Sequence, residues 1–120
     1  MLTPQYEKNT YSTEEQKIGT WIDGKTLYRK TIDCGTVPDK TTLDISTGIS
    51  NVNVVKYEGV VYRSDGATYP LPLVHTLKNY DIKVNTINFG KTIQIVTSVS
   101  DYNVAHLKAY ITLYYTKITD

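Results

Sequence analysis

A two-residue alternation of apolar and polar side chains near the C-terminus places the strongest constraint on the fold. On one face of residues 107–116 lie Leu107, Ala109, Ile111, Leu113 and Tyr115. On the other face lie Lys108, Tyr110, Thr112, Tyr114 and Thr116. Because successive side chains of a β-strand point to opposite faces of a sheet, the pattern predicts a long, half-buried strand.

Two further segments, residues 80–87 and 92–99, follow the same period. Their shared apolar faces carry Ile82 and Val84 in the first segment, and Ile93, Ile95 and Val99 in the second. The dipeptides Asp23-Gly24 and Asp65-Gly66 suit two-residue hairpin loops, because a type I′ turn needs a positive φ at both central residues. Residues 88–91, Asn-Phe-Gly-Lys, predict a third tight turn, whereas residues 41–49 would allow a short helical turn.

Six or more short strands joined by tight turns predict an all-β chain. The expected architecture is an antiparallel β-sandwich that is jelly-roll-like. Residues 1–14 contain a proline and a mixed-charge tract, so we expect a polar lead-in or connector there. Residues 15–120 are then a single β-sandwich knob domain, near the commonest domain size.

Charge and cysteine content exclude several classes of function. Thirteen Lys and Arg are interspersed with 12 Asp and Glu, which argues against a nucleic-acid partner and against an anionic membrane surface. No run of about 18 apolar residues predicts membrane insertion, and the first 20 residues lack the apolar segment of a secretory signal. One cysteine, Cys34, with His75 and His106 cannot supply the four ligands of structural zinc. We expect no metal, no cofactor and synthesis in the cytoplasm.

The aromatic content is unusual, with 11 Tyr against one Trp and one Phe. Tyrosine combines a large apolar ring with a hydroxyl that must stay hydrated or hydrogen-bonded. This favours many half-buried positions, as in a thin β domain. A subunit interface and a platform that stacks on sugars are the alternatives.

The candidate catalytic groups do not form a persuasive pattern. The aspartates Asp23, Asp44, Asp65, Asp81 and Asp101 are spread along the chain, and a pair of them would be needed for a glycosidase. Three of the five lie beside turn signals, where Asp hydrogen-bonds its own backbone. No nucleophile-elbow pattern accompanies the serines, and Cys34 has no nearby base. We expect Cys34 to be a small buried or semi-buried residue and the protein not to be an enzyme.

The segment SVSDYNVAH, residues 98–106, is the candidate recognition loop. Its candidate ligand-binding residues are Asp101, Tyr102, Asn103 and His106. Asp and Asn can share the hydroxyls of a sugar while Tyr stacks beneath the ring. The alternative is a hairpin loop in which Asp and Asn hydrogen-bond their own backbone and no ligand binds. One Asp and one Asn are too few oxygen ligands for calcium.

Two strings at the ends of the chain carry a resemblance to a known family. YSTEEQKIGTWIDGKTLYRKTI (residues 11–32) and AYITLYYTKITD (residues 109–120) resemble the opening and the end of a module found at the C-terminal ends of bacteriophage and prophage virion proteins. These include tail-fibre, baseplate-appendage and head-fibre proteins. The likeness covers about 34 of the 120 residues. The family often has Pro after Gly-Lys, where this chain has Thr26.

The resemblance implies a β-rich knob, usually a homotrimer at the tip of a fibre, and it does not imply an active site. The expected function is a virion appendage module for trimeric assembly and adhesion to host-surface glycans. Its partners would be its own copies, other appendage proteins and a host glycan, and its location the tail, baseplate or head of the virion. Residues 18–22 and 27–32 would form a hairpin, with Trp21 as a mid-strand packing anchor.

Two alternatives remain open. A monomeric carbohydrate-binding module would use Tyr110 and Tyr114 on one solvent face. A polysaccharide-degrading enzyme would need two converging carboxylates in a groove.

Overall fold

The computed structural model describes residues 10–36, 42–64, 66–71, 73–74, 81–97 and 106–119. These residues form strands and turns and contain no helix, which confirms the predicted all-β class. The strands are β1 (Gln16–Thr20), β2 (Thr26–Gly35), β3 (Thr42–Ser46), β4 (Val52–Arg63), β5 (Thr68–Leu71), β6 (Leu73–Val74), β7 (Asp81–Ile87), β8 (Thr92–Thr97) and β9 (His106–Lys117).

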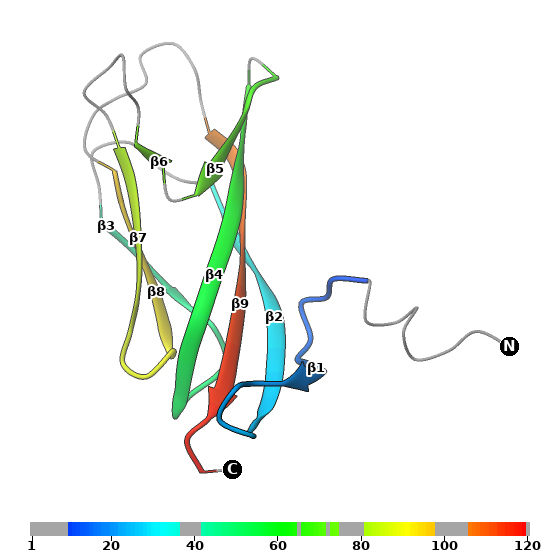
Figure 1. Cartoon of the computed structure of the whole chain (residues 1–120). Coiled ribbons are helices and arrows are strands. Elements are labelled where there is room, and N and C mark those ends of the chain that lie inside the picture. Colours follow the sequence, from blue (N-terminus) through cyan, green and yellow to red (C-terminus); the bar gives the residue numbers. More distant parts are fainter. Residues whose placement is uncertain are drawn as a thin grey trace, which may run out of the picture.

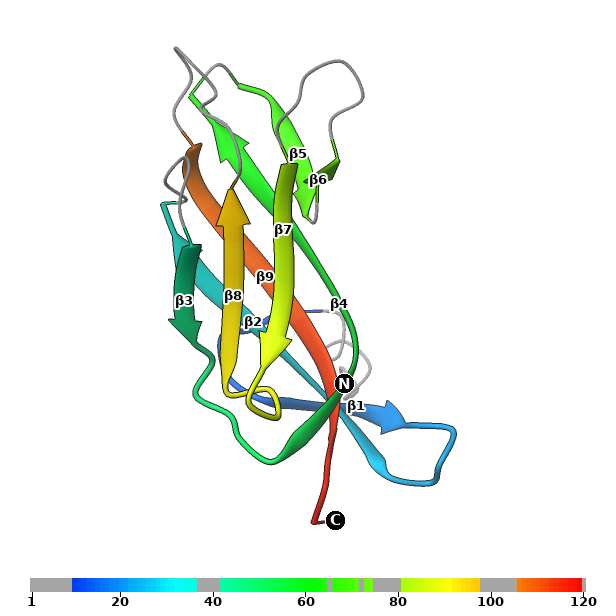
Figure 2. The same ribbon diagram turned by 90° about the vertical axis from the view of Figure 1, so that its left-hand side faces the viewer.

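The strands form two antiparallel sheets that face each other as a sandwich (Figure 1). The larger sheet has the order β1-β2-β9-β4-β5 and the smaller sheet the order β3-β8-β7-β6. Figure 2 shows β3, β8 and β7 in front of β2, β9 and β4. The pairing of β3 with β8 is nested inside the pairing of β2 with β9, as in a jelly roll. The predicted antiparallel sandwich is therefore confirmed.

The core lies between the two sheets and follows the alternation read from the sequence. In β9, the side chains of Ala109, Ile111, Leu113 and Tyr115 are fully buried. The facing residues of the smaller sheet are Ile82, Val84, Ile93 and Ile95, which are also buried. The apolar faces predicted for these three strands are confirmed at these positions. Val99 lies outside the described residues.

The outer face of β9 differs from the prediction of a half-buried strand. Thr112, Tyr114 and Thr116 are also buried, so the second half of β9 is covered on both sides. The hydroxyls of Thr31 and Thr112 lie 2.8 Å apart across the β2–β9 pair, and the chain before β1 covers Tyr114. The alternation showed which residues share a face, but not that the polar face would itself be covered.

The Asp23-Gly24 dipeptide lies in the β1–β2 hairpin, but the loop has three residues rather than two. Trp21 N–H donates to Lys25 O at 2.8 Å, Gly24 N–H donates to Trp21 O at 2.9 Å, and Gly24 has a φ of 87°. The same pair of bonds recurs at the next hairpin, where Arg63 N–H donates to Ala67 O and Gly66 N–H donates to Arg63 O. This is the loop in which a single glycine takes the left-handed conformation.

The longer loop corrects the expected place of Trp21. Strand β1 ends at Thr20, so Trp21 precedes the loop and is half-buried instead of lying mid-strand in the core. Ile22, also expected in the strand, stands at the loop with 89% of its surface exposed.

Two other local predictions have opposite outcomes. The tight turn at residues 88–91 is confirmed, with left-handed backbone at Asn88, Phe89 and Gly90. The helical turn allowed for residues 41–49 is wrong, because β3 occupies most of that segment. Leu43 and Ile45 alternate in β3 and pack against the core, so strand pairing outweighs the weak local preference.

Gly59 in β4 is a point where the fold tolerates no side chain. A Cβ there would lie 2.6 Å from Tyr110 O and 2.9 Å from Ile111 Cγ1, whereas a Cβ at Gly19 meets nothing within 4 Å. Because the clash involves backbone, Gly59→Ala should lower the free energy of unfolding by about 1–3 kcal/mol, and Gly19→Ala should leave it nearly unchanged. Denaturant unfolding of both variants measures this, and equal stabilities would contradict it.

Candidate functional site

The recognition loop predicted from the sequence lies largely outside the described residues. Asp101, Tyr102 and Asn103 belong to the segment that is not described. His106 is the first residue of β9, and its side chain is also outside the description. The assignment of these four residues to ligand binding stays a prediction.

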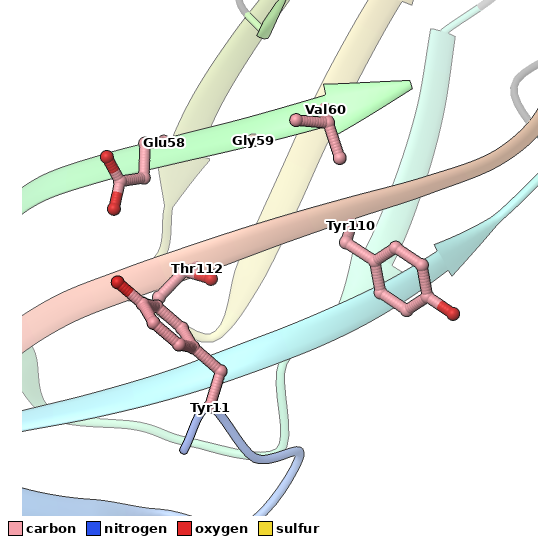
Figure 3. A pocket seen from close by; sticks show the side chains of 6 residues that line it. All are labelled: Tyr11, Glu58, Gly59, Val60, Tyr110 and Thr112. Atoms are coloured by element: carbon pink, nitrogen blue, oxygen red, sulfur yellow. The ribbon is translucent and has the colours of Figure 1, made fainter. Parts of the chain in front are cut away.

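A different candidate site lies on the outer face of the larger sheet. A shallow pocket of about 260 Å³ is lined by Tyr11, Glu58, Gly59, Val60, Tyr110 and Thr112 (Figure 3). Glu58 and Val60 come from β4, and Tyr110 and Thr112 come from β9. These alternate positions face away from the smaller sheet, and Gly59 contributes backbone. The sixth residue, Tyr11, comes from the chain before β1.

Residues 10–12, at the described end of the lead-in, are attached to the sheet. Thr31 N–H in β2 donates to Ser12 O at 2.9 Å. The guanidinium of Arg29 lies 4.0 Å from the centre of the Tyr11 ring. The Tyr11 and Tyr114 hydroxyls are 3.2 Å apart. The lead-in thereby supplies one wall of the pocket, and a domain boundary at residues 14 and 15 stays a prediction.

Arg29, in β2 under the Tyr11 ring, binds the lead-in to the sheet. It is buried, its Nε donates to Gln16 Oε1 at 3.1 Å, and one terminal nitrogen donates to Thr10 O at 3.3 Å. Gln16 Nε2 also donates to Thr10 O at 2.6 Å. Because a buried guanidinium needs its donors paired, these bonds make the position of the lead-in part of the fold.

A chain of hydroxyls joins Tyr11 to Glu58. Tyr114 O–H donates to Glu58 Oε1 at 2.9 Å, so its only proton is used and the Tyr11 hydroxyl must be the donor to Tyr114. Burial, together with the hydrogen bonds to Tyr11 and Glu58, raises the pKa of Tyr114. Tyr114 therefore stays neutral and keeps the proton of its hydrogen bond to Glu58. Lys56 Nζ lies 4.4 Å from the centre of the Tyr114 ring.

The exposed aromatic pair of this face is not the one read from the sequence. Tyr114 is only 6% exposed, so Tyr110 and Tyr114 do not form a solvent-facing pair. Tyr110 instead meets Tyr62 edge to face, with ring centres 6.5 Å apart, and Tyr62 is 44% exposed. The pair depends on the β4–β9 register, in which Val60 opposes Tyr110. The sequence does not reveal this register, so it could not identify Tyr62 as the neighbour of Tyr110.

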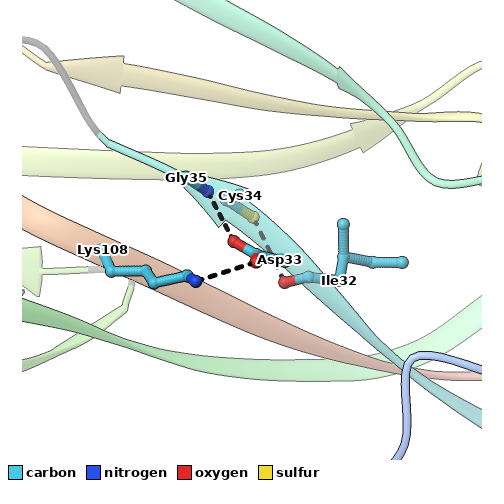
Figure 4. A network of polar contacts seen from close by, with 5 residues as sticks. All are labelled: Ile32, Asp33, Cys34, Gly35 and Lys108. Atoms are coloured by element: carbon cyan, nitrogen blue, oxygen red, sulfur yellow. Dashed lines mark hydrogen bonds and ion pairs between the residues drawn. The ribbon is translucent and has the colours of Figure 1, made fainter.

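A salt bridge borders the tyrosine pair on the side of β2 (Figure 4). Lys108 Nζ lies 3.1 Å from Asp33 Oδ2, and Gly35 N–H donates to Asp33 Oδ1 at 3.0 Å. The hydrogen bond from Gly35 and the contact with Lys108 lower the pKa of Asp33. Lys108 also lies 5.4 Å from the centre of the Tyr110 ring.

Cys34 points into the core beside this salt bridge. It is 7% exposed, and its Sγ lies 3.6 Å from Ile32 O (Figure 4). Burial, with the Asp33 charge as a smaller cause, raises the pKa of the thiol to about 12. Since the thiolate is the reactive form, Cys34 is not poised as a nucleophile. The prediction of a small buried residue is confirmed.

Cys34 should be protected from thiol reagents for as long as the chain is folded. We expect 5,5′-dithiobis-(2-nitrobenzoic acid) to react with it at the rate of unfolding and to react rapidly when denaturant is present. Fast labelling of the native protein, without a change in circular dichroism, would contradict the buried thiol.

A second pocket, of about 300 Å³, lies near the end of β9. It is lined by Glu15, Gly48, Ile49, Ser50, Val52 and Lys117. Tyr115 O–H donates to Glu15 Oε1 at 2.7 Å, and Lys117 Nζ lies 3.0 Å from Glu15 Oε2. Its two charged groups therefore neutralise each other, and no aromatic ring lines it. The tyrosine-lined pocket is the better candidate for a ligand.

Glu15 should make stability depend on pH in the acid range. Burial raises its pKa, but the hydrogen bonds from Tyr115 and Lys117 outweigh burial, so its pKa is lowered from 4.5. A carboxyl whose pKa is lower in the folded chain than in the unfolded chain stabilises the fold when the pH is above its unfolded-state pKa. That stability is lost as the pH falls through the folded-state pKa. Glu15→Gln should be less stable at neutral pH and lose less on acidification. Melting temperatures between about pH 3 and 7 test this, with the exposed Glu14→Gln as control.

The structure describes the side chains of two of the five candidate aspartates, Asp23 and Asp44. Lys25 N–H donates to Asp23 Oδ1 at 3.0 Å, which confirms that Asp23 serves its own turn. Asp44 accepts a hydrogen bond from Gln94 at 3.3 Å. The side chains of Asp65, Asp81 and Asp101 are outside the description. Among the described residues, no three His, Cys, Asp or Glu gather in a way that could hold a metal, and none belongs to a helix that could span a membrane.

Comparisons of the chain with known protein families, with curated proteins and with solved structures find no match.

Proposed function

We propose that this protein is a non-catalytic adhesion module of a phage virion appendage, assembling as a homotrimer and binding host-surface glycans. The Tyr62–Tyr110 pair on the open face of the larger sheet is the observation that carries the adhesion part. Sugars offer C–H surfaces to aromatic rings and hydroxyls to polar groups, and tyrosine provides both kinds of contact. The resemblance at residues 11–32 and 109–120 supports the virion setting.

The trimer part is supported by three exposed apolar residues. They belong to the β1–β2 loop, the β7–β8 turn and the segment after β9, which Figure 1 shows at the end of the sandwich that carries the C-terminus. Ile22 is 89% exposed, Phe89 68% and Ile118 39%. Backbone bonds from Val52 N–H to Phe89 O and from Ile118 N–H to Asn51 O place two of them on neighbouring segments. Exposed apolar groups gathered at one end favour contact with another protein surface.

Phe89 adopts a backbone conformation that its side chain does not favour. Its φ is 54°, a region in which bulky residues are uncommon and Asn is enriched. Such strain persists where it serves a function or where the surrounding structure imposes it. An exposed phenylalanine in a strained turn fits a side chain retained for a contact with another chain.

Adhesion is tested by binding of the whole chain to purified bacterial surface polysaccharides in affinity electrophoresis. We expect retardation by polysaccharide from a host strain, and a large loss of retardation in Tyr62→Ala. Lys83→Ala, exposed on β7, is the control and should bind as the unaltered chain does. Equal retardation of all three proteins would count against this face. A null reducing-sugar assay on the same polysaccharide would remove the degradative alternative.

Assembly is tested by size-exclusion chromatography with light scattering, in which three chains of 13.6 kDa give about 41 kDa. Phe89→Asn should shift the mass toward the monomer without loss of stability, because Asn suits the left-handed turn. The unfolding midpoint serves as the control for stability. A monomeric unaltered chain that still binds polysaccharide would favour the monomeric carbohydrate-binding module.

A further inference from the structure

We propose that the pocket between Tyr11 and Tyr110 binds a single neutral pyranose unit and that Glu58 selects against acidic sugars. This inference rests on the proposed adhesion function and adds a site, a ligand class and a basis for specificity. It places the sugar beside the Tyr62–Tyr110 pair instead of in the loop of residues 98–106.

The size of the pocket limits the ligand to one ring. Its volume of about 260 Å³ lies just below the range typical of pockets for drug-sized molecules, about 300 to 1,000 Å³. A monosaccharide unit fits such a space, whereas a longer oligosaccharide would have to continue along the open face. Figure 3 shows the Tyr11 ring in front of Thr112 and the Tyr110 ring over β2, with Glu58 and Val60 on the neighbouring strand β4.

The lining offers the two kinds of contact that a pyranose needs. Tyr11 is 53% exposed and Tyr110 is half-buried, so both rings have surface left for a ligand. Val60, opposite Tyr110 on β4, adds apolar surface to the lining. Glu58 Oε1 accepts a hydrogen bond from Tyr114, and no described residue donates to its second carboxylate oxygen. That oxygen is an acceptor for a sugar hydroxyl.

Charge complementarity narrows the ligand class. Glu58 is the only charged side chain among the residues that line the pocket. Three cations lie near the pocket, and each contacts another group. Lys108 pairs with Asp33 at 3.1 Å, Lys56 lies over the Tyr114 ring, and Arg29 lies under the Tyr11 ring and donates to Gln16 and Thr10. A carboxylate on the sugar would meet the Glu58 charge at short range, where repulsion between like charges is strongest. Neutral hydroxyl-rich sugars avoid this repulsion.

The site is held in place before any ligand binds. Tyr11 donates to Tyr114, which donates to Glu58, so one chain of hydrogen bonds orients a wall and the acceptor together. Arg29 beneath the Tyr11 ring fixes the same wall from the sheet side. Ordering these groups in the free protein lowers the entropic cost of binding. Weak binding at one pocket would then be amplified by several copies on one appendage.

The test is saturation-transfer NMR titration of the full chain with matched sugars. The probes are the methyl glycosides of glucose and galactose, and the methyl glycosides of glucuronic and galacturonic acid, which differ only in the charge at C6. At least one neutral glycoside should bind about tenfold more tightly than its acidic counterpart. Glu58→Gln should reduce that preference to about threefold or less, because the repulsion is removed.

Two further variants test the aromatic walls. Tyr11→Ala should weaken the binding of the neutral glycoside about tenfold, because one of the two aromatic rings of the pocket is lost. Tyr11→Phe keeps the ring and leaves the Tyr114–Glu58 hydrogen bond in place, so its binding should stay within about threefold of the unaltered chain. Unfolding midpoints confirm that each variant is folded.

The possible failures are distinguishable. If Tyr62→Ala loses polysaccharide binding while Tyr11→Ala does not, the pocket proposal is overturned and the adhesion face stands. Equal affinity for neutral and acidic glycosides overturns the specificity role of Glu58. If no saccharide binds and light scattering shows that Tyr11→Ala lowers the oligomeric state, the pocket is a contact between copies. The pocket proposal and the adhesion part of the proposed function then both fail.

Discussion

The burial of the second half of β9 on both of its faces is the constraint on which the rest of the structure depends. Its inner face places Ile111, Leu113 and Tyr115 at 0% exposure against the smaller sheet. Its edges pair with β2 on one side and β4 on the other, so every other strand of the larger sheet is positioned through it. The ring of Tyr115 stacks on Tyr28 at 5.7 Å, and its hydroxyl reaches Glu15. The strand thus joins the core to the start of β1.

Covering the outer face of this strand also creates the candidate site. Thr112 and Tyr114 are withdrawn from water by the chain before β1, and the same segment leaves the Tyr11 ring standing at the edge of the pocket. The tyrosine hydroxyls make this arrangement possible, because each buried ring can satisfy its polar end with a neighbour. The high tyrosine content therefore serves two purposes, covering the sheet and lining the pocket on the same face.

The alternation in residues 107–116 was sufficient to predict the strand and its inner face, because inward and outward positions follow from backbone geometry alone. The glycines at 24 and 66 likewise located two hairpins. The loop length was not predictable, because Asp-Gly is compatible with two-residue and three-residue loops, and the single extra residue moved Trp21 and Ile22 out of the strand. The helical turn at residues 41–49 failed because pairing with β8 outweighed local preference.

By itself, the sequence determined the all-β class, the main inner faces of the strands and the positions of the tight turns. Each of these depends on neighbours in the chain, whose spacing the backbone geometry dictates. Only the tertiary structure decided that Tyr62 meets Tyr110, that Tyr11 lies over Arg29 and that Glu58 accepts from Tyr114. These contacts join residues far apart in sequence, and they depend on strand order and register, which local alternation leaves open.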